Sequence, residues 1–391
     1  MKVIKKSGSI TEFDPNKIIK AVNKSAKRVL VNFTETELNR ICSNVERILK
    51  DLGIEEVEVS MLHNIVEKAL EMENSEVAKS YKDYRNYKVD FVGMLDEVYK
   101  KAQKIMYLGD KDNSNTDSSL VSTKRSLIYN ELNKELYNKF FLTSEEREAC
   151  KEGYIYIHDT SSRRDTLNCT LFDVPAIMSG GFEMGNMWYN EPKTIDVACD
   201  VLGDIIMMSA SMIYGGWSTR VDNLLAPYVE KTYNKYKQEI EELILKTKGT
   251  LSKKDLEEIA TEKTMTDLMQ GIQGLEYKLN SVASSRGDYP FTTFAIGLGT
   301  SKFEKMVSEA VLKVRMNGQG KKGKKRQVLF PKIIFLYDEN LHGEGKELED
   351  IFELGILCSS KSMYPDWLSL SGEGYVPSMY KQYGEVVYPM G

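Results

Sequence analysis

The sequence predicts a small α+β domain followed by a larger α/β region. Three observations lead to this fold class. Two short alternating runs and four helical patterns fill the first ninety residues. A polar stretch at 109–119 then interrupts the pattern. Beyond it, apolar strand-like runs alternate with long helical segments, which is typical of an α/β sheet or barrel.

The N-terminus is predicted to begin with a β-hairpin. Runs at 2–6 and 10–13 alternate between apolar and polar residues and flank Ser7 and Gly8. Asp14 is then expected to cap a helix whose first turn holds Pro15, since proline needs no N–H there.

Four helical segments follow the hairpin. Their apolar residues recur at helical spacing over 18–30, 38–48, 60–69 and 75–84, and Gly53 is expected to end the second. We therefore predict a regulatory-sized domain over 1–92, a linker over 93–125 and a second domain over 126–391.

Strands and helices alternate in the second region. Buried strands are predicted at 166–172, 292–297 and 328–336, and helices at 194–213, 223–245 and 254–282. Strands that are separated by helices favour a parallel sheet or barrel.

Composition excludes several classes of protein. The formal net charge of −5 argues against a nucleic-acid footprint over the whole surface. No apolar run approaches the length of about 20 residues that spans a membrane. The five cysteines include no C-x-x-C pair, so neither a disulfide framework nor a metal site is predicted within this chain. A reducing cytoplasm is the expected compartment.

The hairpin carries the first candidate site. Lys5 and Lys6 adjoin the turn, and Lys17 lies one helical turn after the cap. Cations near a turn and a helix N-terminus can bind polyphosphate, because exposed N–H groups add to their charge. An ordinary hairpin with solvated lysines explains the same pattern.

Cys169 is the second candidate. It lies in a strand pattern beside Asn168 and Thr170, and a strand can hold a reactive sulfur rigidly. A buried structural cysteine is the alternative. His158 and Asp159 precede this strand, and the histidine could bind a hydroxyl, act as a base or make one structural hydrogen bond.

A basic loop at 317–326 is the third candidate. It combines three glycines with five cations before a predicted strand. Such a loop could cradle a triphosphate, but it lacks the helix start of a P-loop. A solvated hairpin loop is the alternative.

Taken together, these segments resemble the anaerobic (class III, glycyl-radical) ribonucleoside-triphosphate reductases along the whole chain. The N-terminal residues are similar to an ATP-cone, a module that senses ATP against dATP. The later segments that carry the resemblance are Asn113–Thr116, Gly153–Asp159, Arg164–Cys169, Gly181–Gly185, Tyr214–Gly216, Pro290–Thr293, Gly297–Ser301 and Phe330–Lys332.

The resemblance implies a fold and residue roles. It implies a β-hairpin plus four-helix cone, followed by roughly the first half of a ten-stranded α/β barrel. ATP and dATP are the implied effectors, and Cys169 matches the strand cysteine that supplies reducing hydrogen. Candidate substrate contacts are His158 and Asn168. The implied nucleotide-binding residues of the cone are Lys5, Lys6, Gly8, Asp14, Lys17 and His63.

The resemblance also implies partners and segments beyond Gly391. The family continues there with a radical cysteine, and later with a zinc site and a glycyl-radical loop. We therefore expect the N-terminal piece of a split, intein- or intron-interrupted, or truncated reductase, inactive alone. Implied partners are ribonucleoside triphosphates, a radical-SAM iron–sulfur activase, a C-terminal reductase fragment and a second copy in a homodimer. The alternative is an ATP/dATP-binding regulatory module that acts on a complete reductase.

Overall fold

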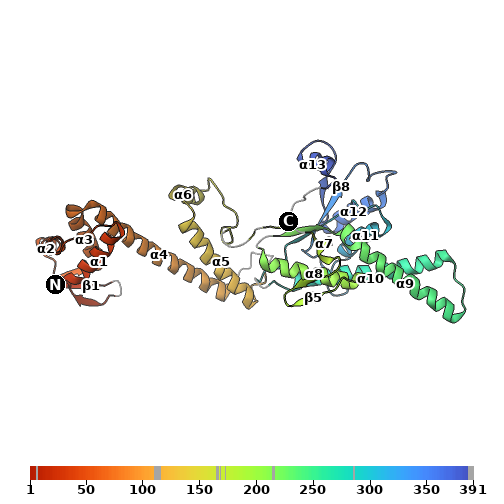
Figure 1. Ribbon diagram of the computed structural model, residues 1–391, viewed down its shortest axis with the longest axis horizontal. Coiled ribbons are helices and arrows are strands. Elements are labelled where there is room, and N and C mark those ends of the chain that lie inside the picture. The colour runs from red at the N-terminus through yellow and green to blue at the C-terminus, as the bar shows by residue number, and fades with distance from the viewer. Residues whose placement is uncertain are drawn as a thin grey trace. The chain divides into compact units, whose positions relative to one another are not determined.

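The computed structural model describes residues 1–5, 8–109, 116–163, 167, 169–171, 173–213, 216–284 and 287–385 (Figure 1). The chain divides into two compact units, Met1–Lys100 and Lys101–Gly391. The predicted boundary at residue 92 falls inside a helix, α4, which is described below.

The first unit joins a three-stranded sheet to a group of helices. Strand β1 (Lys2–Ile4) pairs antiparallel with β2 (Ile10–Glu12), as the hairpin prediction required. It also pairs parallel with β3 (Glu56–Glu58), which the sequence analysis missed. Three residues are too few to show a clear alternation, although Val57 is buried between two exposed glutamates.

Four helices complete the first unit: α1 (Pro15–Arg28), α2 (Glu35–Asp51), α3 (Val59–Glu73) and the start of α4 (Ser75–Leu108). Their apolar faces form one core with Val3 and Val57 of the sheet. Asp14 caps α1 by accepting a hydrogen bond from the Asn16 N–H at 3.0 Å.

The predicted linker at 93–125 is helical for most of its length, and the division between the two units, after Lys100, falls within it. Helix α4 continues to Leu108, and α5 (Val121–Phe140) begins soon afterwards. Met94 and Val98 are buried along this part of α4, and Gly93 does not break the helix. Gly109, with a φ of 70°, follows the last helical residue.

The second unit contains a parallel sheet, which confirms the α/β prediction. Its strands follow in the order β6 (Trp217–Arg220), β7 (Thr292–Ile296), β8 (Lys332–Tyr337) and β9 (Asp366–Ser369). Every neighbouring pair is parallel, so each connection crosses over through helices.

The remaining elements of this unit surround the sheet. Helices α9 (Val221–Thr247), α10 (Lys253–Ser281), α11 (Lys302–Asn317) and α12 (Glu349–Ser362) form the crossovers. The others are α6 (Ser144–Glu152), α7 (Val174–Met178), β4 (Phe182–Met184), β5 (Met187–Tyr189), α8 (Ile195–Met212) and α13 (Tyr375–Tyr383).

The sheet has two differently covered faces. Trp217, Phe294 and Phe335 project into the large core that the crossover helices and α8 share. Ala295 and Ile334 project to the opposite face, and Val376 and Tyr380 of α13 pack against the small core there. Alternate residues of each strand therefore belong to two separate cores.

Two predicted strands differ from the structure. At 166–172, the described residues make only isolated parallel bridges, Leu167 with Ile213 and Thr170 with Trp217. Strand β8 begins at Lys332 and not at 328. Pro331 has no N–H to donate, and the N–H groups of Leu329 and Phe330 donate instead to the Asn280 side chain.

Candidate functional site

Cys169 lies next to the amino-terminal end of the parallel sheet. The Thr170 N–H donates to the Gly216 carbonyl at 3.2 Å, and the Trp217 N–H donates to the Phe291 carbonyl at 3.2 Å. Three segments that are distant in sequence therefore lie in register at this edge. The Cys169 thiol is free and exposed.

The bridge between Thr170 and Trp217 indicates which way Cys169 faces. Paired residues project to the same face of a sheet, and Trp217 projects into the helix-covered core. Cys169, one residue earlier, therefore belongs to the opposite face. Ser218 and Thr293, which pair across β6 and β7, share that face.

Ser218 is a residue that the sequence analysis did not single out. It is 3% exposed, and its Oγ has no hydrogen-bond partner among the described residues. A buried hydroxyl without a partner is costly and is found where a ligand or water completes it. The face can thus offer a thiol and hydroxyl groups to a polar ligand.

His158 lies on an exposed turn before this edge. Its Nδ1 contacts the Asp159 carboxylate, and its carbonyl accepts a hydrogen bond from Arg163 Nη1 at 3.2 Å. Asp159 has a φ of 55°, which is unusual for a residue other than glycine. Among the described residues, no hydrogen bond joins His158 to Cys169 or Thr170. Asn168, the other predicted contact, lies outside the described residues.

The hairpin places part of the predicted nucleotide site beside α3. The Gly8 N–H donates to the Lys5 carbonyl at 2.9 Å, and Gly8 has a φ of 76°, as its place in the turn requires. Ile4 pairs with Glu58, immediately before α3, so the turn adjoins the helix that carries His63. Lys6 lies outside the described residues.

The start of α1 lies at the other end of the same short strands. Lys2 pairs with Glu12, so the Asp14 cap and Lys17 follow from that end. The strands rise about 3.3 Å per residue, so two residues of strand, about 7 Å, separate the two ends. The side chains of Lys5 and Lys17 are both exposed.

His63 has a specific partner that sequence reasoning did not find. Its Nδ1 lies 2.6 Å from the Tyr81 hydroxyl of α4. Burial raises the pKa of Tyr81 to about 12, so this hydroxyl stays protonated and can donate to the histidine. The contact fixes the ring of His63 near the start of α3.

Comparisons with known proteins show the family of this chain. The family model described as anaerobic ribonucleoside-triphosphate reductase matches residues 112–391, and the one described as ATP cone domain matches residues 1–89. The chain belongs to the anaerobic ribonucleoside-triphosphate reductase family. Its first unit is the ATP cone of that family.

Named relatives show the same relationship. The anaerobic ribonucleoside-triphosphate reductase of Haemophilus influenzae is 32% identical over 376 residues, which are 94% of this chain and 52% of the relative. That of Escherichia coli is 30% identical over 378 residues, covering 94% of this chain and 51% of the relative. The chain thus spans about half the length of the curated relatives that it matches.

Solved structures of the family are more distant. The anaerobic ribonucleotide reductase from Thermotoga maritima in complex with dATP and CTP has a TM-score of 0.44 and 15% identity, over 72% of this chain and 50% of that one.

Two kinds of feature are absent from the described residues of the present chain. No cluster of three or more His, Cys, Asp or Glu residues is arranged there to hold a metal ion. No described helix is long and apolar enough to cross a membrane.

Proposed function

We propose that this chain supplies the nucleotide-sensing cone and part of the catalytic barrel for the anaerobic reduction of ribonucleoside triphosphates. The observation that carries the proposal is the position of Cys169 at the amino-terminal edge of the parallel sheet, on the face that Ser218 shares. In this role Cys169 donates a hydrogen atom during substrate reduction. Radical generation belongs to groups outside these 391 residues.

The polar groups near Cys169 fit a ribose substrate. Ser218 offers a buried hydroxyl without a protein partner, and a sugar hydroxyl would satisfy it. We assign His158 and Asn168 as further substrate contacts. His158 is exposed and is held through its backbone and its ring, so it is available to a ligand from the solvent side.

The cone has a regulatory role in this proposal. Lys5 and Lys17 bind the phosphates of ATP or dATP, with Lys6, Gly8 and the cap at Asp14 completing the site. Exposed cations close to a helix N-terminus favour an anion. His63, oriented by Tyr81, contacts the same nucleotide from α3.

The test is reconstitution. The chain is mixed with a segment that supplies the rest of the relatives' length, together with a radical-SAM activase, a reductant and ribonucleoside triphosphate. Formation of the deoxyribonucleotide, and its loss in Cys169→Ser, is the expected result. The matched control is Cys150→Ser, since Cys150 lies on α6 and outside the sheet. Equal activity in Cys169→Ser would refute the assigned role.

A purely regulatory function is the second candidate, because residues 1–89 match the ATP cone domain, a nucleotide-sensing module. Here the chain would bind ATP or dATP and act on a complete reductase. Nucleotide binding without any turnover in the reconstituted mixture, together with altered activity of an added intact reductase, would favour it. Homodimerisation, which we also propose, is measured on the same samples by light scattering.

A further inference from the structure

Lys332 is a charged residue at the amino-terminal edge of the parallel sheet, and the proposed function does not use it. It is the first residue of β8, is half-buried, and pairs with Thr293 of β7. Thr293 in turn pairs with Ser218 of β6. Because paired residues project to the same face of a sheet, Ser218, Thr293 and Lys332 form one row across three strands. Cys169 lies beside this row, on the same face.

The ammonium of Lys332 lies at the edge of the sheet. Its Nζ is 4.8 Å from the centre of the Phe291 ring. Phe291 immediately precedes β7, and its carbonyl accepts a hydrogen bond from the Trp217 N–H at the start of β6. A cation is attracted to the face of an aromatic ring, so this contact holds the ammonium at the edge where Cys169 lies.

The spacing of the strands places this ammonium within reach of a ligand at Cys169. Neighbouring strands are about 4.8 Å apart. The Cys169 segment, β6 and β7 follow one another across the edge, so about 10 Å separate the Cys169 segment from the strand that Phe291 precedes. Ser218 lies on the strand between them. A ligand that contacts the thiol and the Ser218 hydroxyl can therefore extend its next group to Lys332.

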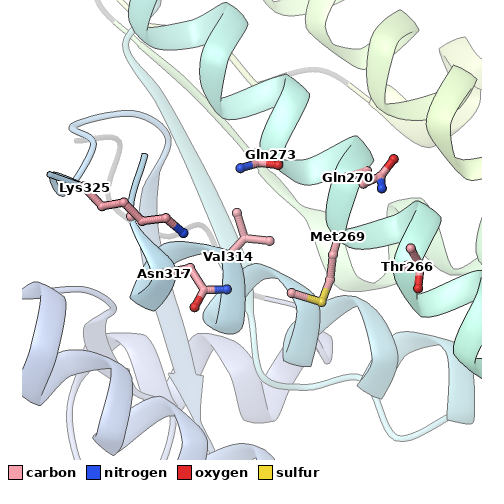
Figure 2. Close-up of a pocket in the computed structure, with 8 residues that line it drawn as sticks. Thr266, Met269, Gln270, Gln273, Val314, Asn317 and Lys325 are labelled. Carbon is pink, nitrogen blue, oxygen red and sulfur yellow. The ribbon is translucent and has the colours of Figure 1, made fainter. Parts of the chain in front are cut away.

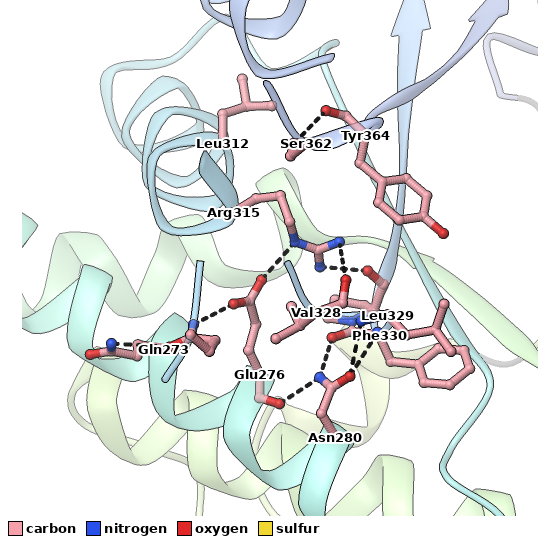
Figure 3. Close-up of polar contacts among 12 residues, drawn as sticks. Gln273, Glu276, Asn280, Leu312, Arg315, Val328, Leu329, Phe330, Ser362 and Tyr364 are labelled. Atoms are coloured by element: carbon pink, nitrogen blue, oxygen red, sulfur yellow. Dashed lines mark hydrogen bonds and ion pairs between the residues drawn. The ribbon is translucent and has the colours of Figure 1, made fainter. Parts of the chain in front are cut away.

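Buried side chains fix the backbone that leads into Lys332 (Figure 3). Asn280 of α10 accepts from the Phe330 N–H at 3.0 Å and donates to the Phe330 carbonyl at 2.6 Å. Arg315 of α11 donates to the Pro331 carbonyl at 2.6 Å. These bonds come from two helices to consecutive residues, so the start of β8 is held in one position.

The arginine of this clamp is not available to a ligand. Arg315 Nε lies 3.0 Å from Glu276 Oε1, and both side chains are at most 3% exposed. The second oxygen of Glu276 accepts from the Gln319 side chain at 2.5 Å. Arg315 is thus buried and paired with a carboxylate, so it cannot bind an anion in place of Lys332.

The basic loop at 317–326 directs its charge elsewhere. Gln319 and Arg326 exchange two backbone hydrogen bonds of 2.8 Å each, which close the loop, and its five cations are all exposed. Gln273 donates to Gln319 at 3.1 Å and lines a cavity of about 270 Å³ between α10 and α11. Figure 2 shows Lys325 extending beside this cavity. The loop therefore adjoins these two helices, whereas Lys332 belongs to the row at the sheet edge.

We propose that Lys332 is a further substrate-binding residue. Its ammonium binds a phosphate of the ribonucleoside triphosphate, while the Ser218 hydroxyl binds the ribose beside Cys169. A half-buried ammonium is screened less than an exposed one, and its hydrogen bond to a phosphate is charge-assisted. This inference rests on the proposed function and adds to it the residue that selects a phosphorylated substrate.

The closeness of Lys332 to Cys169 is tested without any nucleotide. Iodoacetate and iodoacetamide alkylate the Cys169 thiol of the full chain, and peptide mass spectrometry measures both rates. Their ratio cancels differences in thiolate content, because both reagents consume the same thiolate. An ammonium about 10 Å away favours the anionic reagent, so Lys332→Gln should lower the ratio about twofold at low ionic strength. Cys150 on α6 is the internal reference, and its ratio should stay constant.

Protection of Cys169 by substrate tests the phosphate contact. In the parent chain, CTP and cytidine should each slow alkylation by iodoacetamide. Lys332→Gln should raise the CTP concentration for half-protection about tenfold, the loss of one charge-assisted hydrogen bond, and leave protection by cytidine unchanged. Lys332→Arg should restore protection by CTP because it keeps the charge, which separates the contact from a folding defect.

Lys302 supplies the matched control. Its Nζ lies 4.2 Å from the centre of the Tyr233 ring, and it begins α11, beyond the carboxyl end of β7. Lys302→Gln should change neither the reagent ratio nor the protection.

Three results would overturn the proposal. The first is equal weakening of CTP and cytidine by Lys332→Gln. The second is protection by CTP that survives unchanged in Lys332→Gln, which would refute the Lys332 contact alone and leave the proposed function intact. The third is failure of both ligands to protect the parent chain, which would refute the proposed substrate site at Cys169 together with the contact.

Discussion

Arg315 and Glu276 form a fully buried ion pair whose disruption should be costly. Glu276→Gln leaves the Arg315 guanidinium buried without its counter-charge, although the Pro331 carbonyl still accepts from Nη2 at 2.6 Å. We expect a loss of about 3–5 kcal/mol in the free energy of unfolding. All three tryptophans, Trp188, Trp217 and Trp367, lie in the second unit, so urea unfolding followed by their fluorescence measures this loss there.

A surface pair on α11 provides the matched control. Lys313 and Glu309 form an ion pair one helical turn apart, and both side chains are at least one-third exposed. Glu309→Gln should change the free energy of unfolding by less than about 0.5 kcal/mol. Similar losses in the two variants would contradict the special role of the buried pair.

His342 should make the second unit less stable in mild acid. Its Nε2 lies 2.8 Å from the Gly297 carbonyl and its Nδ1 accepts from the Asp338 N–H at 3.0 Å, which fits the neutral ring. Burial among Phe335, Tyr337 and Phe352 lowers the pKa of His342 below 6.5. Between this lowered pKa and about pH 6.5, the unfolded chain therefore binds a proton at His342 that the folded chain does not bind.

The stability that His342 contributes is thus fully present above about pH 6.5 and declines as the pH falls toward its folded pKa. Urea midpoints between pH 5 and pH 7.5 measure this decline. We expect His342→Gln to have a flatter profile than the parent chain over that range, whatever its absolute stability. Parallel profiles would show that other groups cause the pH dependence.

At the scale of elements, the N-terminus of α5 packs against the loop before β7 through a glycine. A Cβ at Gly287 would lie 2.3 Å from Thr123 Cα and 2.5 Å from Thr123 N, and the φ of Gly287 is 87°. Gly287→Ala therefore combines backbone strain with a backbone clash. We expect it to destabilise the second unit by about 2–4 kcal/mol in the tryptophan-monitored urea unfolding.

Gly274 is the control for this substitution. It lies within α10, and a Cβ there would meet nothing within 4 Å. Gly274→Ala should stabilise the same unit by about 0.5–1 kcal/mol, since alanine favours a helix. The two glycine substitutions are thus expected to differ in sign. Destabilisation of equal size by both would contradict this account of Gly287.

Long periodic elements and the local hairpin could be predicted from the sequence, whereas elements that depend on contacts with distant segments could not. Helices α8, α9 and α10 begin and end within two residues of their predicted limits, and β7 begins at the predicted residue. Strand β3 has only three residues and exists because β1 pairs with it, which is a tertiary effect. The start of β8 depends on Asn280, which lies on another element.

The candidate sites show the same division between local and non-local information. The cap at Asp14 and the turn at Gly8 follow from adjacent residues and could be predicted. The face on which Cys169 lies could not, because it depends on the pairing of Thr170 with Trp217. The contact of His63 with Tyr81 likewise joins two helices.

At the scale of the whole molecule, the two units allow nucleotide binding to be assigned without ambiguity. The first unit contains no tryptophan, so its stability is followed by hydrogen exchange over residues 1–100, while fluorescence reports the second unit alone. A ligand at 100 times its dissociation constant stabilises the unit that binds it by about 2.7 kcal/mol. Each unit therefore provides its own measure of binding.

In the parent chain, ATP should protect the amides of the first unit, and Lys5→Ala/Lys17→Ala should lose this protection because the phosphates lose two cations. The cone and the face that Cys169 and Ser218 share lie in different units, so hydrogen exchange and fluorescence measure binding at each of them separately. Unchanged protection of the first unit in the Lys5→Ala/Lys17→Ala chain would contradict the cone assignment of these lysines.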